Sequence, residues 1–167
     1  MSQEIINRVA KSKLKTIDLD FFCPKTERIS FDIKPWLKDE LFLLEKDFRK
    51  KVENFEWQNF NNKAVFIICS NDAIIPDWAF ILVSSQLNNQ GIINVIGSKE
   101  VLDIKLITDS INTFDFSIYK DKPVIIKGCS DQKIPLSAYS VLLEKLQHHA
   151  KSIMFGEACS SVPIYKS

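Results

Sequence analysis

Glycine is scarce in this sequence, with 4 residues in 167, so a collagen-like or glycine-rich low-complexity chain is excluded. Cysteine is also too rare, again with 4 residues, for a small scaffold held together by disulfides. The longest apolar runs are far shorter than the roughly 20 residues that cross a bilayer, so we expect no membrane span. The first fifteen residues have no continuous apolar stretch and carry Glu4, which is unlike a secretory signal. We therefore expect a cytoplasmic protein with reduced cysteines.

Neither positive nor negative charge predominates in this sequence. The 22 Lys and Arg residues nearly balance the 21 Asp and Glu residues, and the net charge is +1. Such a molecule has no overall field to gather phosphates, so we expect no nucleic-acid partner. A glycine-rich phosphate loop is also missing, which argues against a nucleotide site. The sequence does not indicate an oligomeric state.

What is present fits a folded globular protein. Hydrophobic residues make up 46% of the chain and include 12 Phe, enough for a sizeable core in a single domain of 167 residues. We expect residues 1–167 to form one α/β domain, with an N-terminal attachment over 1–62 and a parallel βα core over 63–167.

The predicted core is marked by short apolar runs that alternate with helical segments. A run without polar alternation is typical of a strand buried on both faces, and helices between such strands give right-handed crossovers. The predicted strands are 64–69, 92–96, 124–127 and 153–155. The predicted helices are 76–87, 100–111 and 135–149. The fold class is therefore α/β with a mainly parallel sheet.

The N-terminal third has a different pattern. Residues 16–22 and 28–33 alternate polar and apolar side chains, which predicts two short strands joined through Pro24 as a β-hairpin. Residues 43–55 carry an apolar stripe at helical spacing and predict an amphipathic helix packed on the sheet.

Three of the predicted strands are followed by the same phrase: Cys-Ser, a short linker, a β-branched residue and Pro. The cysteines are Cys69, Cys129 and Cys159. Pro76 and Pro135 stand where they can open helices, because the first helical position needs no amide donor. Each cysteine is thus expected at the carboxyl end of a strand.

The carboxyl ends of parallel strands share one edge of a sheet, so we expect the three thiols to converge there. Strand 92–96 ends without cysteine and is placed at an edge. The expected order is 92–96, 64–69, 124–127, 153–155.

Three thiolates at one edge suit a metal, either zinc or an iron–sulfur centre. The fourth position is open, and Asp72, Asp131 or Glu157 could fill it. The serines that follow the cysteines, Ser70, Ser130 and Ser160, belong to loops that point toward helix N-termini, which favour an anion or a thiolate.

Two other interpretations stay open. One cysteine could be a reactive thiol at a helix N-terminus, as in a thiol enzyme or a persulfide carrier, with no metal. Alternatively, the chain is an interaction module whose cysteines only pack, because cysteine is among the most buried residue types. Cys23 lacks the phrase and is read as an ordinary thiol.

At ICSNDAIIPDWA, VIIKGCSDQKIPLSAY and SIMFGEACSSVPIYK the chain resembles a bacterial family of unknown function, family twenty-four-eighty. The N-terminal stretches IDLDFF and RISFDIKPWL fit as well, so the resemblance runs the whole length. It implies no established activity. It does imply an association with iron–sulfur cluster assembly, with the assembly proteins as partners. Cys69, Cys129 and Cys159 are the ligands that it carries over.

Overall fold

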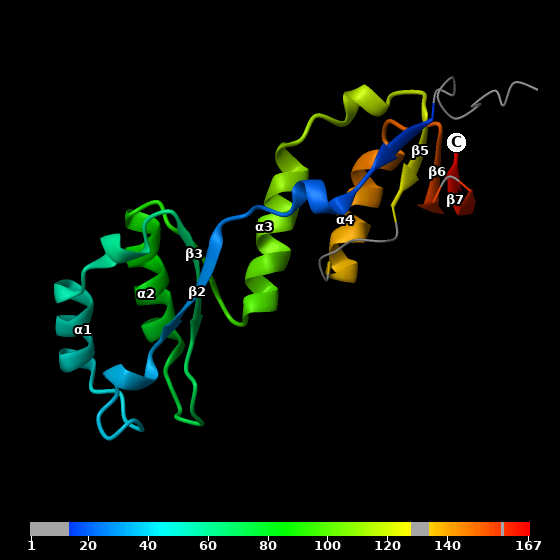
Figure 1. Ribbon diagram of the computed structural model, residues 1–167. Coiled ribbons are helices and arrows are strands. Elements are labelled where there is room, and N and C mark those ends of the chain that lie inside the picture. The colour runs from blue at the N-terminus through cyan, green and yellow to red at the C-terminus, as the bar shows by residue number, and fades with distance from the viewer. Residues whose placement is uncertain (1–13, 128–133, 158) are drawn as a thin grey trace, which may run out of the picture. The chain divides into compact units, whose positions relative to one another are not determined.

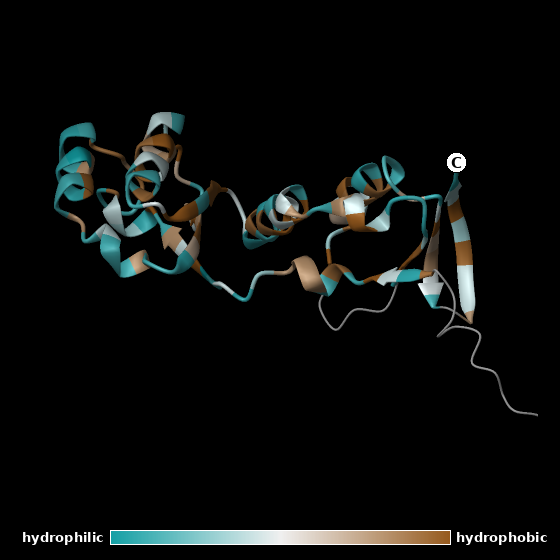
Figure 2. Ribbon diagram, turned by 90° about the horizontal axis from the view of Figure 1, so that it is seen from above, coloured by the Kyte–Doolittle hydropathy of each residue, from teal (hydrophilic) through white to brown (hydrophobic). Residues whose placement is uncertain are grey.

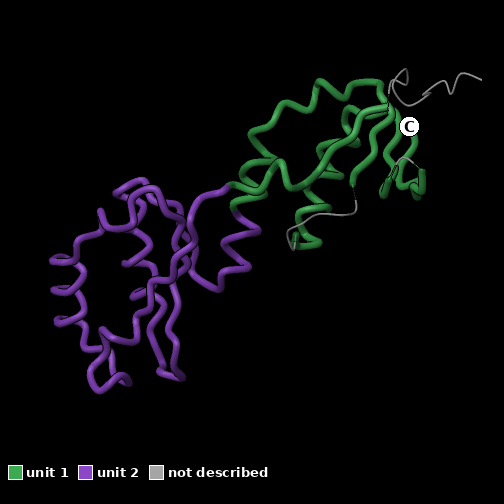
Figure 3. The backbone as a smooth tube through the Cα atoms, in the orientation of Figure 1, with its two compact units in different colours: residues 1–24, 106–167 green, residues 25–105 purple. Residues whose placement is uncertain are grey.

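The computed structural model describes residues 14–127, 134–157 and 159–167. The chain divides into two compact units (Figure 3): unit 1 is Met1–Pro24 with Leu106–Ser167, and unit 2 is Lys25–Lys105. Unit 2 is therefore inserted into the sequence of unit 1. Both units combine helices with parallel strands, which confirms the α/β fold class.

Unit 2 holds a parallel sheet in the order β2-β3-β4. The strands are β2 (Glu27–Asp32), β3 (Lys63–Ile68) and β4 (Ile93–Ile96). The helices are η2 (Lys34–Trp36), α1 (Glu45–Asn54), η3 (Trp57–Phe60) and α2 (Asp77–Asn89). Both α1 and α2 pack on the same face of the sheet (Figure 1), because their buried side chains share one hydrophobic cluster with those of β2 and β3.

Unit 1 holds a second sheet in the order β1-β5-β6-β7, parallel except for β7. The strands are β1 (Lys15–Ile17), β5 (Pro123–Ile126), β6 (Ser152–Glu157) and β7 (Ser160–Lys166). The helices are η1 (Leu19–Phe22), η4 (Phe116–Tyr119) and α4 (Leu136–Gln147), together with the end of α3 (Lys99–Thr113). None of the helices in the described residues is long and apolar enough to cross a membrane.

The two units repeat one architecture. In each, a strand and a short 3-10 helix are followed along that unit's sequence by an α-helix, a second 3-10 helix, a strand, another α-helix and a strand. Nine of the buried residues that the structure describes in unit 2 have a buried counterpart 59 positions later in unit 1. These pairs are Phe48 and Ile107, Val52 and Ile111, Trp57 and Phe116, Phe60 and Tyr119, Val65 and Val124, Ile67 and Ile126, Ala79 and Ala138, Val83 and Leu142, and Leu87 and Leu146. Equal spacing of the core positions makes the units two copies of one βαβαβ frame.

Backbone details repeat at the same spacing. Pro76 and Pro135 cap α2 and α4, and each carbonyl accepts the amide of the residue three positions on at 3.0 Å. Asn62 and Asp121 both have a positive φ, 64° and 57°, in the turns before β3 and β5. Asn and Asp tolerate this conformation better than most residues, so both turns place a suitable residue at the position with positive φ.

Helix α1 has the most polar outer surface of the unit 2 helices, and it is largely teal in Figure 2. Its buried side chains, Phe48 and Val52, are one turn apart and face the sheet. The prediction of an amphipathic helix over 43–55 is therefore confirmed, with observed bounds Glu45–Asn54.

Three sequence predictions are wrong. Strands β1 and β2 do not form a hairpin, because each pairs in parallel with a later strand, β5 and β3 respectively. The predicted single sheet is two sheets, since β3 and β5 are both central strands with other neighbours. Residues 1–62 also supply a strand to each sheet, so they are not a separate attachment.

Candidate functional site

Cys69 directly follows β3, at the start of the loop that leads to α2. Its side chain is half-buried against the unit 2 core, and its Sγ donates a hydrogen bond to Asn71 Oδ1 at 2.9 Å. The same amide oxygen also accepts the amide of Ala73 at 3.4 Å. Asn71 thus holds both the thiol and the turn that follows it.

A carboxylate from the neighbouring strand organises this loop. Asp32, the last residue of β2, accepts hydrogen bonds on Oδ1 from the amides of Lys34 and Ser70, each at 3.0 Å. Burial works to raise the pKa of Asp32, but hydrogen bonds from the Ser70 hydroxyl and from the two amides outweigh it, so the pKa lies below its ordinary value. The ionised Asp32 therefore fixes the ends of β2 and β3 to each other.

Lys34 adds a positive charge to the same edge. Its Nζ lies 3.0 Å from Glu40 Oε2. The hydrogen bond and the charge of Glu40 raise the pKa of Lys34, with smaller contributions from Asp32 and the sulfur of Cys69. We call Asp32, Lys34, Glu40, Cys69, Ser70 and Asn71 the Cys69 cluster. In it, a thiol, an amide, two carboxylates and an ammonium group meet at the carboxyl edge of the sheet.

The corresponding edge of unit 1 begins in the same way. Asp18 follows β1 and accepts the amide of Asp20 on Oδ1 at 3.0 Å, as Asp32 accepts that of Lys34. Lys127 Nζ lies 3.7 Å from Asp18 Oδ2. The residues predicted for the site after β5, Cys129, Ser130 and Asp131, lie outside the described residues.

Cys159 occupies a different setting from the one expected. It lies between β6 and the antiparallel β7, so it belongs to a β-hairpin and does not precede a crossover helix. Its side chain is exposed. Gly156 opens this hairpin at φ 120°, and a Cβ there would lie 2.6 Å from the Ser160 carbonyl oxygen. Glycine is required for this turn, which places Glu157 and Ser160 opposite each other.

The structure places the strands that precede two of the predicted ligands side by side. Strands β5 and β6 are parallel neighbours with Ile126 opposite Phe155, and Cys129 and Cys159 follow these residues by three and four positions. Cys69 belongs to the other unit and to the other sheet. Within residues 14–127, 134–157 and 159–167, no three His, Cys, Asp or Glu side chains form a group that could hold a metal. Asp72 is exposed in the loop after Cys69.

The partners of Cys69 were not found by sequence reasoning. Asp32, Lys34 and Glu40 come from segments more than 25 residues earlier, and none matches a local motif. A signal was nevertheless present in the sequence. In TIDLDFF and in SFDIKPW, an Asp stands two residues before a charged residue. These aspartates are Asp18, directly after β1, and Asp32, the last residue of β2.

Comparison with curated proteins and with solved structures found no match. A family model confirms the resemblance carried by the three Cys-Ser phrases: described as "Protein of unknown function (DUF2480)", it matches residues 3–167, and the chain belongs to that family.

Proposed function

We propose that this protein binds zinc or an iron–sulfur centre through the cysteine thiolates of unit 1, Cys129 and Cys159. Thiolate is the ligand that both metals prefer in proteins. In the iron–sulfur form, the protein acts as an accessory of cluster assembly or transfer, with the assembly proteins as partners.

The observation that carries the proposal is the parallel pairing of β5 and β6. Paired strands lie about 4.8 Å apart. Ile126 and Phe155 are opposite each other in the register. Each residue of chain spans at most about 3.5 Å, so three or four residues are enough to bring both thiols to a shared metal. The exposed position of Cys159 also leaves its sulfur accessible to a metal or a partner.

The donor set favours a centre that keeps open positions. Two cysteines leave two sites of a tetrahedral metal free for water, a carboxylate or a transferred group. Asp131 and Glu157 are the candidates for a carboxylate ligand from unit 1, because one follows β5 in the sequence and the other ends β6.

Metal analysis of the full chain, purified without oxygen, tests the proposal. We expect about one zinc ion per chain, or iron with matching acid-labile sulfide and visible absorption. Cys129→Ser and Cys159→Ser should each lose most of the metal.

Cys23→Ser is the matched control. The Cys23 thiol is half-buried and lies 3.5 Å from the carbonyl oxygen of Leu19, to which it donates, so this variant changes a thiol without touching the proposed centre. It should keep the full metal content. A wild-type chain without stoichiometric metal would overturn the proposal, and so would a Cys69, Cys129, Cys159 triple variant that retains it.

A second candidate function rests on the surroundings of Cys69. Cys69 is only half-buried and belongs to the same cluster as the ammonium of Lys34, and cationic, partly exposed surroundings are typical of reactive cysteines. As a persulfide carrier, the Cys69 thiolate would attack the outer sulfur of a donor persulfide, and the donor would leave as a thiolate. Alkylation at neutral pH should then label Cys69 faster than Cys23, and Lys34→Met should remove the difference. Equal labelling of the two would count against this candidate.

A further inference from the structure

The segment between η2 and α1 in unit 2 forms a tight loop with an unusual backbone. The amide of Lys38 donates to the carbonyl of Phe42 at 2.8 Å, and the amide of Phe42 donates back at 3.0 Å. Between them, Asp39 and Glu40 have φ values of 51° and 57°, in the left-handed region that disfavours residues with a Cβ. Such a conformation persists only where the surroundings fix it, and it is frequent at functional sites.

The loop is fixed by the Cys69 cluster. The Glu40 carboxylate pairs with Lys34 at 3.0 Å, and the Asn71 side-chain amide donates to the Glu40 carbonyl. Two separate segments therefore hold Glu40 by its side chain and by its backbone. A loop held in this way presents its outer side chains in one arrangement, which lowers the entropy cost of binding a partner.

The outer side chains of this loop are apolar. Leu41 is 54% exposed, Phe42 is 61% exposed and Leu44 is 43% exposed. An isolated exposed apolar residue needs no explanation, but three within four positions on a rigid loop form a patch of the kind that marks an interaction site.

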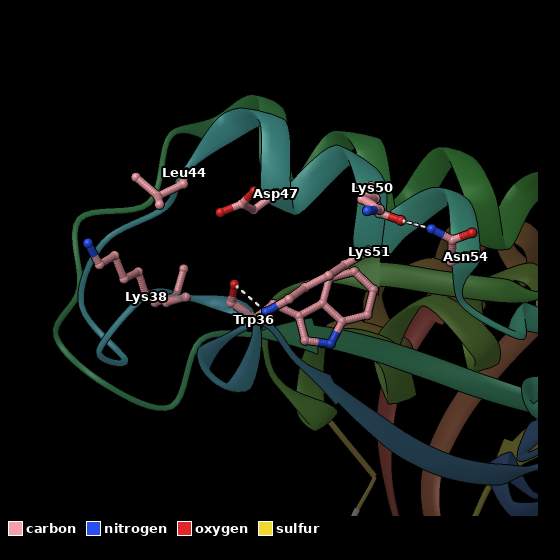
Figure 4. Close-up of a pocket in the computed structure, with 8 residues that line it drawn as sticks. Trp36, Lys38, Leu44, Asp47, Lys50, Lys51 and Asn54 are labelled. Atoms are coloured by element: carbon pink, nitrogen blue, oxygen red, sulfur yellow. Dashed lines mark hydrogen bonds between the residues drawn. The ribbon is translucent and has the colours of Figure 1, made fainter.

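A groove of about 490 Å³ lies beside this patch, between α1 and residues 36–38 (Figure 4). Leu37 and Trp36 form its apolar floor, and the ammonium of Lys51 reaches across to the Trp36 carbonyl at 3.1 Å. Figure 4 shows Leu44 and Lys38 at one end of the groove, with Asp47 on α1 above it. Its lining also includes Lys50 and Asn54. Three lysines against one aspartate give the groove a net positive charge.

The two units differ at this surface although their cores agree. The positions 59 residues after Lys50 and Lys51 hold Asp109 and Ser110, so the basic character of α1 has no counterpart in α3. Residues 37–44 have no counterpart of similar length either, because after Cys23 the sequence of unit 1 is interrupted by unit 2. The exposed side chains of the loop and the lysines of the groove are therefore additions to the shared frame.

We propose that the loop 38–44 and the adjoining groove dock an acidic segment of a partner protein that carries an aromatic or aliphatic side chain. The apolar side chain packs on Phe42 and Leu44, and the acidic residues face Lys38, Lys50 and Lys51. The groove is concave, so a flat anionic lipid surface reaches its lysines less well. The same groove of a second copy would bring a like positive charge.

A random 12-residue peptide library, displayed on phage and selected on the full chain, tests this proposal without a known partner. We expect enriched peptides to combine Asp or Glu with Leu, Phe or Trp. Binding of an enriched peptide, measured by fluorescence anisotropy, should weaken about tenfold with Phe42→Ser and with the Lys38→Glu, Lys50→Glu double variant.

Matched controls come from unit 1. Leu136 is 85% exposed and Lys120 is also exposed, so Leu136→Ser and Lys120→Glu change an exposed apolar residue and an exposed lysine that do not line the groove, and they should leave peptide binding unchanged. Thermal melts of all variants establish that each one folds. No enrichment, enrichment of basic peptides, or equal losses in the controls would overturn the proposal.

The other occupants are measured in parallel. Binding to phosphatidylserine–phosphatidylcholine vesicles that is lost with Phe42→Ser would assign the patch to a membrane surface. A dimer in light scattering that dissociates with the same variant would assign it to a second copy. Either result would also overturn the proposal. Because none of these readouts involves metal, failure here is distinct from failure of the proposed metal centre.

Discussion

Unit 1 and unit 2 share their buried positions and differ in what they add around them. Unit 2 adds the loop 38–44 and a charged α1, whereas unit 1 adds the hairpin of β6 and β7 that carries Cys159. The shared positions, such as Leu87 and Leu146, are almost fully buried in both units. The comparison teaches that burial at fixed spacing maintains the frame, and that each unit carries its own additions on the surface of that frame.

Truncating a matching buried side chain in each unit tests whether the two cores are equivalent. Leu87→Ala and Leu146→Ala remove side chains that are 0% exposed at matching positions of α2 and α4. We expect each to lower the free energy of unfolding by about 3 kcal/mol. Urea denaturation measures the loss, and hydrogen exchange assigns it to one unit. A cost below about 1 kcal/mol in either variant would break the equivalence.

The glycines that end β4 and β6 test where the units differ. Gly97 and Gly156 both have a positive φ, but a Cβ at Gly97 meets only the Val101 side chain at 3.4 Å, whereas one at Gly156 meets a backbone oxygen at 2.6 Å. We therefore expect Gly97→Ala to cost about 1 kcal/mol and Gly156→Ala about 2–3 kcal/mol. Equal costs in denaturant titrations would show that the hairpin yields to the added methyl group.

The acidic residue that ends β2 gives a pH-dependent test. Asp32→Ala should cost about 1–2 kcal/mol at pH 7, because it removes the acceptor of hydrogen bonds to an ionised group. Since the pKa of Asp32 is lowered in the folded state, its contribution is full above its ordinary value of 3.8 and is lost as the pH falls through the lowered value.

The stability difference between wild type and Asp32→Ala should therefore shrink as the pH falls below 3.8. Urea titrations over a pH series measure it. Asp103 also has a lowered pKa, because Lys99 and Arg28 outweigh the effect of its burial, but it is present in both proteins and cancels from the difference. A difference that stays constant throughout the acid range would contradict the role given to Asp32.

The smallest effect concerns the charged surface of α1. Arg49 pairs with Glu45 at 2.9 Å and lies over the Trp78 ring at 5.1 Å, whereas its counterpart in unit 1 is Thr108. The pair is exposed, so Arg49→Gln should cost about 0.5 kcal/mol, and less at high salt. A loss above about 1.5 kcal/mol in a thermal melt would show that this surface also supports the frame.

Local structure could be read from the sequence because it depends on neighbouring residues. The run 64–69 predicts β3, and Pro76 and Pro135 mark the starts of α2 and α4 to within a residue. Strand pairing depends instead on residues far apart. The three residues of β1 carry no sign that they pair with β5, more than a hundred residues later, so a local hairpin with β2 was the simpler prediction.

The candidate site, like the fold, could be predicted only where it depends on neighbouring residues in the sequence. The Cys-Ser phrases correctly indicate strand ends, and Cys69 lies directly after β3. Their similarity suggested adjacent strands, although similar phrases also arise when a frame is repeated in two separate sheets. Pro76 and Pro135 stand 59 positions apart, the spacing of the core pairs, and this regularity was visible in the sequence. The hydrogen bond from Cys69 to Asn71 and the contact of Asn71 with Glu40 depend on three-dimensional packing and carry no such signal.

The insertion of one unit into the other sets an order for synthesis. All strands of unit 2 have left the ribosome when residue 105 has been exposed, so that unit can fold while the rest of the chain is still being made. The sheet of unit 1 must wait, because Lys15 of β1 needs Val124 of β5 as its partner. Until then β1 lacks its partner strand, so the sheet of unit 1 depends on a contact between residues more than a hundred positions apart, which is the kind of contact that forms slowly.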